Sequence, residues 1–202
     1  NTATSFKRTI KKRRTIKMKK WNGYETTQVI GEKRKLPAGA YVCKIIDANE
    51  EVYGWGNVVV IHFDIAEGPY KNFYLEQYEK QKGDKKWKGT YRLTCPKDDG
   101  SEKDERIKKN FKTFIHHIEK SNTGYKWDWN EHNLRAKLFG GIFGEKEYEI
   151  EGNTGFFTTL RYTTDTESVK TALIPKPILL KRDTVATAKA PEFNWGDDAL
   201  PF

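Results

Sequence analysis

The sequence predicts a mainly β domain of the OB type, a five-stranded Greek-key barrel with one helix between its third and fourth strands. Two observations support this prediction. Three or more segments with strand-like alternation precede a single strong helix pattern, and two or three more follow it. Aromatic residues make up 13% of the chain, which suits a small barrel filled by large side chains. A general α+β sandwich is the alternative.

The first half of the predicted domain contains the strongest strand signals. A turn at 36–39 leads into an alternating segment at 40–47, and residues 57–66 alternate most clearly. In that second segment, Val59, Ile61, Phe63 and Ile65 share one side, which we expect to face the core. A turn at 67–69 leads into the aromatic-rich residues 70–78, where the next strand is expected. A basic loop at 80–88 then precedes a short strand at 90–94.

The predicted helix begins after Ser101 and ends near Asn122 and Gly124. Ser101 and Asp104 have the spacing of an N-terminal capping box. Apolar residues then recur at helical spacing and form one stripe, namely Ile107, Phe111, Phe114, Ile115 and Ile118. This pattern predicts a helix that packs one face against the barrel.

Strands are predicted again after the helix. Residues 136–143, 147–151 and 156–164 have strand character, with a glycine-containing turn at 152–155. From Ile174 onward, prolines at 175, 177 and 191 and a run of small and polar residues favour a linker. The chain therefore divides into a basic, disordered extension (1–35), an OB domain (36–182) and a flexible linker with an acidic tip (183–202).

The net charge of +9 comes entirely from the N-terminal segment. Nine of the 37 Lys and Arg residues lie in residues 1–20, which contain no acid, and the remaining residues carry 28 of each sign. Such an arm can bind nucleic acid through its phosphates. Alternatively, because Met18 is the only methionine, translation starts there and residues 1–17 are not native. The arm is therefore not the main argument for DNA binding.

The composition excludes several classes of protein. The longest apolar run, Val58 to Ile61, cannot span a bilayer, and no signal-peptide core follows the basic start. Two cysteines, Cys43 and Cys95, cannot form a disulfide scaffold and fit a reducing cytoplasm. We expect a soluble, cytoplasmic protein.

No catalytic or metal motif is recognisable. The cysteines and the four histidines lack zinc-ligand spacing, and there is no phosphate-binding loop or nucleophile elbow. The acids at 98–105 allow a remote alternative, a metal-dependent nuclease. An acidic turn that starts the helix is the simpler interpretation. We therefore expect no enzyme activity, no metal and no cofactor.

Aromatic and basic residues are interleaved through the domain, as in proteins that bind single strands. Bases stack on exposed aromatic rings while cations follow the phosphates. Gly flanks Trp55, Lys flanks Trp87, and Gly89 and Arg92 lie near Tyr91, so we expect these rings to face solvent. The predicted DNA-binding residues are Tyr53, Trp55, Lys71, Tyr74, Lys82, Lys85, Lys86, Trp87, Lys88, Tyr91, Arg92, Trp127, Arg135 and Arg161.

The last residues combine acids with an apolar end. The predicted partner-binding residues are Asp197, Asp198, Leu200, Pro201 and Phe202. An apolar pocket for Phe202, with a cation that binds its carboxylate, would suit such a peptide. The acids would steer it toward a basic rim.

These residues resemble the acidic tip of bacterial and phage single-stranded-DNA-binding proteins, which ends in Ile-Pro-Phe after several acids. The body is similar to a phage-borne group of that family in LPAGAYVCKI (36–45), FDIAEGPYKNFY (63–74), IEKSN (118–122) and GGIFGEKEY (140–148). The tip here departs from the family pattern, because Ala199 separates the two acids from Leu200, which replaces Ile. The linker is also shorter than in many bacterial members.

The resemblance implies an OB fold, DNA binding without strong sequence preference and no catalysis. It implies a protein of the bacterial host cytoplasm that coats single strands during phage or mobile-element replication and recombination. The tip would recruit replication, recombination and repair enzymes, and homo-oligomers are compatible with this class. An annealing protein that forms large rings is the alternative in the binding class.

Overall fold

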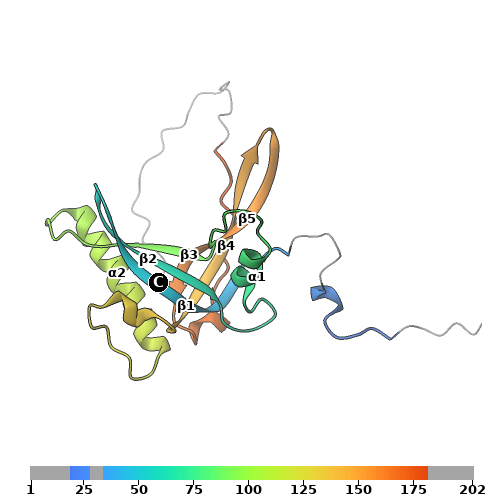
Figure 1. Cartoon of the computed structure of the whole chain (residues 1–202), viewed down its shortest axis with the longest axis horizontal. Helices are drawn as coiled ribbons and strands as arrows, with labels where there is room; N and C mark the ends of the chain where they lie inside the picture. The colour runs from blue at the N-terminus through green and yellow to red at the C-terminus, as the bar shows by residue number, and fades with distance from the viewer. Residues whose placement is uncertain (1–18, 28–33, 182–202) are drawn as a thin grey trace, which may run out of the picture. The chain divides into compact units, whose positions relative to one another are not determined.

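The structure is a computed structural model that describes residues 19–27 and 34–181 (Figure 1). The chain divides into two units, residues 1–34 and residues 35–202. In the first unit, the 3-10 turn η1 (Tyr24–Thr26) follows Trp21, whose ring contacts Tyr24 edge to face at 5.0 Å. The Lys20 Nζ lies 2.7 Å from the Glu25 carboxylate. Residues 1–18 and 28–33 of the predicted basic extension lie outside the described residues.

The second unit is mixed α/β, with one five-stranded antiparallel sheet. The strands are β1 (Gly39–Tyr53), β2 (Gly56–Ile65), β3 (Thr90–Thr94), β4 (Leu138–Ile150) and β5 (Asn153–Thr164). Their order in the sheet is β3-β2-β1-β4-β5. The helices are α1 (Phe73–Glu79) and α2 (Glu102–Ser121), with the 3-10 turns η2 (Glu131–Leu134) and η3 (Ser168–Lys170). Figure 1 shows α2 beside one end of β1–β3 and α1 beside the other.

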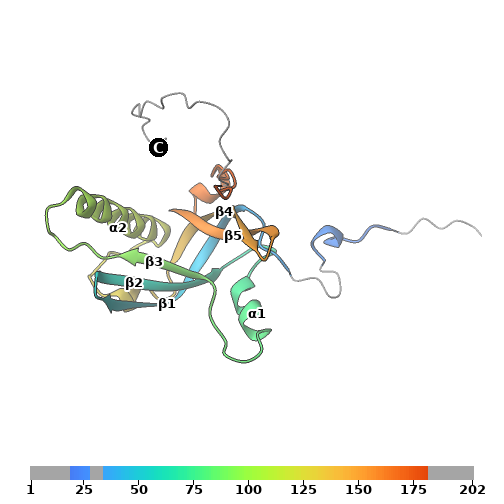
Figure 2. The same cartoon turned by 90° about the horizontal axis from the view of Figure 1, so that it is seen from above.

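The sheet does not close into a barrel, so that part of the prediction is wrong. β3 and β5 form its two edges and do not pair with each other. β3 has only five residues, whereas β4 and β5 have 13 and 12. The long helix α2 packs on β3, β4 and β5, so a helix rather than a strand pair connects the two edges (Figure 2).

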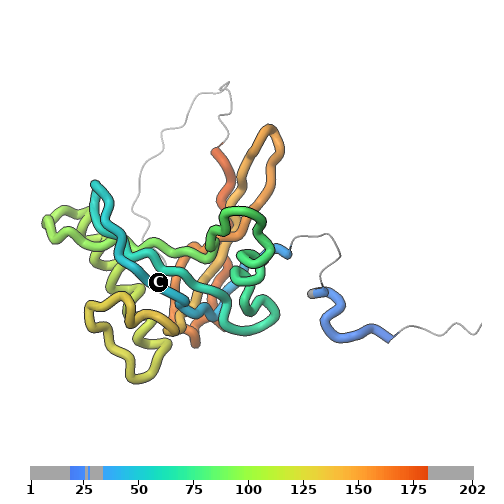
Figure 3. Tube along the Cα trace, in the orientation of Figure 1, coloured from blue at the N-terminus to red at the C-terminus, as the bar shows by residue number. Residues whose placement is uncertain are grey.

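β1 belongs to both halves of the sheet. Its residues 39–44 pair with β4, while its residues 43–53 pair with β2. A bulge at Ile46, between the pairs Ile45↔Phe63 and Asp47↔His62, lies where the two pairings meet. A bulge bends a strand and increases its twist. The β1–β2 and β4–β5 turns therefore stand well apart at their tips (Figure 3).

The core lies between the curved sheet and α2. Val59, Ile61, Phe63 and Ile65 of β2 are buried in one cluster, as the alternation predicted. Three residues of the predicted helix stripe, Phe114, Ile115 and Ile118, are buried in the same cluster.

The predicted limits of α2 are confirmed. The Ser101 Oγ accepts a hydrogen bond from the Asp104 N–H at 3.1 Å, as an N-cap does. At the other end, Asn122 Nδ2 donates to the Ile118 and Leu138 carbonyls, both at 2.8 Å. Asn122 thus ends the helix and ties it to the start of β4.

The strand expected at residues 70–78 is replaced by α1. The buried Asp64 carboxylate accepts the N–H groups of Tyr74 and Leu75, each at 2.9 Å, and that of Ile65 at 2.8 Å. It thereby satisfies two N–H groups of the first helical turn, which have no partner within a helix. A side chain ten residues earlier in the sequence thus stabilises the helix.

Two further predictions differ from the structure after α2. Residues 136–143 and 147–151, expected as separate strands, form the single strand β4. Residues after Ile174 were expected to be linker, but Ile178 pairs with β4: its N–H donates to Glu145 O at 2.9 Å, and its carbonyl accepts from Glu147 N at 2.8 Å. Across residues 19–27 and 34–181, no helix is long and apolar enough to cross a membrane.

Candidate nucleic-acid interface

One face of β1, β2 and β3 points away from the core, and we call it the outer face. Strand alternation and register place on it Asp47, Asn49, Glu51 and Tyr53 of β1, Val58, Val60 and His62 of β2, and Thr90, Arg92 and Thr94 of β3. The two valines are buried between flanking strands, and Arg92 is exposed. The middle of the outer face is therefore apolar, and polar and aromatic groups surround it.

An exposed aromatic pair lies at the β1–β2 turn. The rings of Tyr53 and Trp55 stack with centroids 5.4 Å apart and planes 14° apart. They are 37% and 58% exposed. Tyr53 pairs with Gly56, so Gly54 and Trp55 form the two-residue turn. We call Tyr53 and Trp55 the aromatic platform, because two parallel rings offer a flat surface to a nucleobase.

Arg92 reaches this platform from β3. The Tyr53 hydroxyl donates a hydrogen bond to the Glu51 carboxylate, which raises the pKa of Tyr53. A hydrogen bond with Arg92 opposes that rise in pKa, so the guanidinium lies beside the same hydroxyl. Three predicted site residues, Tyr53, Trp55 and Arg92, are therefore adjacent although they come from two separate stretches of sequence.

A cavity of about 390 Å³ lies beside Trp55. Its lining includes Thr94 of β3 and the cations Lys97 and Lys103. Asp99 and Asp104 also line it. The platform thus has cations within reach on its helix side, and the acids there belong to the network at the start of α2.

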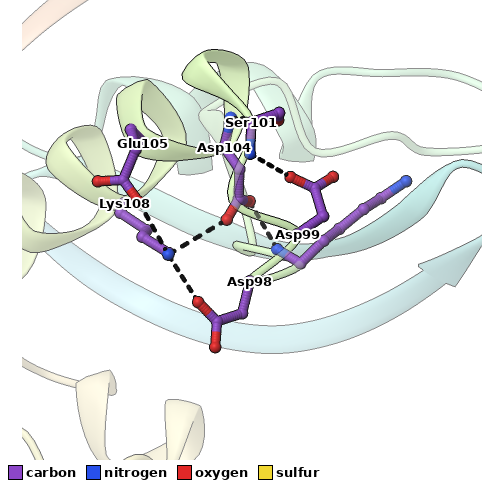
Figure 4. A network of polar contacts seen from close by, with 7 residues as sticks. Asp98, Asp99, Ser101, Asp104, Glu105 and Lys108 are labelled. Atoms are coloured by element: carbon purple, nitrogen blue, oxygen red, sulfur yellow. Dashed lines mark hydrogen bonds and ion pairs between the residues drawn. The ribbon is translucent and has the colours of Figure 1, made fainter.

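The acids at the start of α2 already have partners (Figure 4). Lys108 Nζ lies 2.6 Å from Asp98, 3.0 Å from Glu105 and 3.5 Å from the buried Asp104. The other Asp104 oxygen accepts the Lys97 N–H at 2.7 Å. Asp98 and Glu105 raise the pKa of Lys108. Among the residues that the structure describes, no group of three or more His, Cys, Asp or Glu side chains could hold a metal ion.

A second cavity brings together three other predicted residues. Lys71, Trp87 and Arg135 line a space of about 550 Å³ between β1, the end of β2 and α1. Trp87 forms part of its wall, because the indole Nε1–H donates to the Phe63 and Gly89 carbonyls at 3.1 and 3.0 Å. Lys71 and Arg135 are exposed at this cavity.

The expectation that Trp87 and Tyr91 face solvent is wrong, whereas for Trp55 it is confirmed. Trp87 and Tyr91 pack against the core, and the Tyr91 ring lies 5.1 Å from that of Phe114. Tyr91 pairs with Ile61 on the inner side of β3. Tyr74 is buried and contacts Phe63 edge to face, and burial raises its pKa strongly. In this conformation Tyr74 and Tyr91 have structural roles.

The remaining predicted residues lie away from the platform. Lys82, Lys85, Lys86 and Lys88 are exposed in the loop between α1 and β3, where Lys85 Nζ donates to Glu79 O at 3.2 Å. Trp127 packs edge to face on Phe111 of α2, with ring centroids 6.2 Å apart. Arg161 of β5 is partly buried, and its guanidinium lies 5.8 Å from the Tyr162 ring centroid. The structure does not bring these residues together in one site.

The sequence reasoning missed two exposed aromatic groups. Trp129, 82% exposed, lies in a loop with a positive φ of 64°, and the Asp128 carboxylate accepts N–H groups from Asn130 and Asn133 beside it. On the β4–β5 hairpin, Tyr148 and Phe157 are exposed with ring centroids 6.1 Å apart. Their alternation was visible in the sequence, but it does not tell which face of a projecting hairpin is left uncovered.

The predicted partner-binding residues, Asp197, Asp198, Leu200, Pro201 and Phe202, lie outside the described residues. Comparison with models of known protein families gives no match, and comparison with characterised proteins gives no significant relative. The functional argument therefore depends on the geometry of the outer face.

Proposed function

We propose that this protein binds single-stranded DNA on the outer face of β1–β3, without catalysis. The observation that carries the proposal is the stacked, exposed pair Tyr53 and Trp55 with the Arg92 guanidinium beside it. Base stacking on such rings contributes about 1–3 kcal/mol per base and tolerates any sequence. A guanidinium next to the rings can pair with the adjoining phosphate.

The topology supports the same function. OB folds are partly open five-stranded Greek-key barrels that bind oligonucleotides on the face of strands 2 and 3 and with the loops between strands 1–2 and 4–5. The order β3-β2-β1-β4-β5, with α2 between β3 and β4, is compatible with an OB fold opened between strands 3 and 5. The platform lies in the 1–2 loop, and the exposed Tyr148 and Phe157 lie on the hairpin of strands 4 and 5.

The proposal for the role in the cell rests on the resemblance of the sequence to single-stranded-DNA-binding proteins. We propose that the protein coats single strands during phage or mobile-element replication and recombination in the bacterial cytoplasm. In this proposal, residues Asp197–Phe202 recruit partner enzymes. The nuclease alternative has little support, because four acids of this segment already have partners. Lys108 pairs with Asp98, Asp104 and Glu105, and the Ser101 N–H donates to Asp99.

Fluorescence anisotropy with labelled oligothymidylate tests the proposal. Trp55→Ala should weaken binding by about 1–3 kcal/mol. Its melting temperature should stay close to wild type, because the ring is exposed. Trp129→Ala removes an indole that is even more exposed than Trp55 and lies outside the outer face, so it serves as the matched control. Full affinity in Trp55→Ala, or tighter binding of duplex than of single strands, would contradict the proposal.

A further inference from the structure

The cavity between β1, the end of β2 and α1 has the size of a small-ligand site. Its volume is about 550 Å³, within the range of about 300–1,000 Å³ of small-molecule pockets. Ile46 and Leu75, both partly exposed, contribute its apolar surface together with Ala66. We call it the α1 cavity.

Irregular backbone converges on the α1 cavity. Ile46 is the extra residue of the β1 bulge, and Asn72 and Ala136 have positive φ values of 59° and 66°. All three line the cavity. Non-glycine residues such as alanine rarely adopt a positive φ, because this conformation strains the backbone. Strained backbone and β-bulges are both common at ligand sites.

The charge at the α1 cavity is positive. Lys44, Lys71 and Arg135 line it and are exposed, and within residues 19–27 and 34–181 none of the three forms an ion pair. The one acid in the lining, Asp64, is buried and accepts three backbone N–H groups. An anion would therefore meet three available cations and one carboxylate that is already satisfied.

The α1 cavity lies on the same surface as the aromatic platform. Register places the pair Lys44↔Asp64 on the outer face, on the side of β1 and β2 that carries Asn49, Val60 and Tyr53. Tyr53 follows Lys44 by nine positions along β1, which corresponds to about 30 Å at the rise of a strand. One strand of DNA along the outer face can therefore reach both.

We propose that the α1 cavity holds one nucleotide of the bound single strand, and this inference rests on the proposed function. The base lies on the apolar surface of Ile46 and Leu75. Lys44, Lys71 and Arg135 bind the adjoining phosphate. The platform and the cavity then fix the two ends of one binding track.

The test compares a cavity variant with a platform variant in the full chain. Lys44→Gln/Arg135→Gln removes two cavity cations, and Lys109→Gln/Lys112→Gln removes two exposed cations of α2 as the control. Binding is measured with oligothymidylates of about 4 and about 15 nucleotides, the limits of OB-fold site sizes. The shorter strand cannot reach from the platform to the cavity. Only the affinity for the longer strand should therefore depend on the cavity cations.

The cavity variant should bind the longer strand about tenfold more weakly at low salt. Its salt slope should fall by about 0.7 for each lost phosphate contact. The short strand should bind as tightly as it does to wild type, and the control variant should change neither value. Leu75→Glu, which places a negative charge on the exposed apolar surface, should reproduce the loss without a lower melting temperature.

Failures of the two proposals are distinguishable. If wild-type protein binds no single strand, the proposed function and the cavity assignment fail together. If Trp55→Ala weakens binding but the cavity variant matches the control, only the cavity assignment is wrong. A synthetic peptide of residues 193–202 that binds wild type but not the cavity variant, with DNA affinity unchanged in that variant, would assign the cavity to a peptide and overturn the inference.

Discussion

Several buried acids stabilise the local structure around them, and Asp165 is the clearest example. Its carboxylate accepts hydrogen bonds from Lys120 Nζ at 2.9 Å, Ser168 Oγ at 2.8 Å and Ser168 N at 3.0 Å. Burial raises the pKa of Asp165, but the bonds from Lys120 and Ser168 lower it more, so the net pKa lies well below the usual 3.8. The ionised carboxylate thus ties α2 to the η3 turn.

The Asp165→Asn variant should lose about 2 kcal/mol of unfolding free energy near pH 7, because a charge-assisted network becomes neutral. A folded-state pKa below the unfolded value gives stability that is present above about pH 4 and is lost as the pH falls further. The gap between wild type and variant should therefore narrow from about pH 4 to about pH 3 in urea unfolding. An equal gap at every pH would show that the charge of Asp165 is not involved.

Gly140 must remain glycine because neighbouring atoms lie too close to its backbone to leave room for a side chain. A Cβ there would lie 2.6 Å from both Asp165 O and Thr164 Cγ2, and 2.7 Å from Val169 Cγ2. Gly140→Ala should therefore destabilise the protein by about 1–3 kcal/mol through overpacking. Thermal unfolding measures this, with Gly54→Ala as the control, since no atom lies within 4 Å of its Cβ position. Equal melting temperatures for the two variants would contradict the argument.

At the scale of elements, α2 connects the two edges of the open sheet, so its N-cap matters for the whole second unit. Ser101→Ala removes the acceptor for the Asp104 N–H and should cost about 1 kcal/mol in urea unfolding. Ser101→Asp keeps an acceptor and adds a charge that the helix dipole favours. We expect Ser101→Asp to equal or exceed wild-type stability. If both variants lose the same stability, the cap does not act as described.

The two long hairpins differ in how they are supported. The β1–β2 hairpin is flanked by β3 and, in its first part, by β4. Among the residues that the structure describes, β4 beyond residue 143 pairs only with β5 and with Ile178. The exposed Tyr148 and Phe157 belong to this less supported arm. In an OB-type binder such a hairpin would lie close to the bound strand.

At the scale of the whole molecule, the division into two units predicts the effect of removing the first. Deletion of residues 1–34 should leave the melting temperature of the second unit unchanged, because the core cluster begins at Leu36. Selectivity for single strands should persist. The salt slope of binding should fall, because nine cations of residues 1–20 are removed. A truncated chain that does not fold, or that loses all affinity for single strands, would show that the first unit is required.

The sequence by itself determined the elements whose signals are local. The alternation of Val59, Ile61, Phe63 and Ile65 predicted β2 and its core face, because a strand directs every second side chain to the same side. Ser101 and Asn122 predicted the limits of α2, because caps act on backbone groups a few residues away. Trp55 was correctly expected to face solvent, since it occupies a two-residue turn with glycine on both sides.

Only the tertiary structure decided the features that depend on distant residues. Residues 70–78 have strand-like composition, but the Asp64 carboxylate stabilises a helix there. Trp87 donates a hydrogen bond to Phe63 O, and Tyr91 packs on Phe114, so both rings lie against the core. No local sequence pattern reveals these distant partners. Lys44, Lys71 and Arg135 come together at the α1 cavity from separate elements. Strand register and the order of the elements in the fold determine which of these side chains share a surface. Their spacing along the sequence does not.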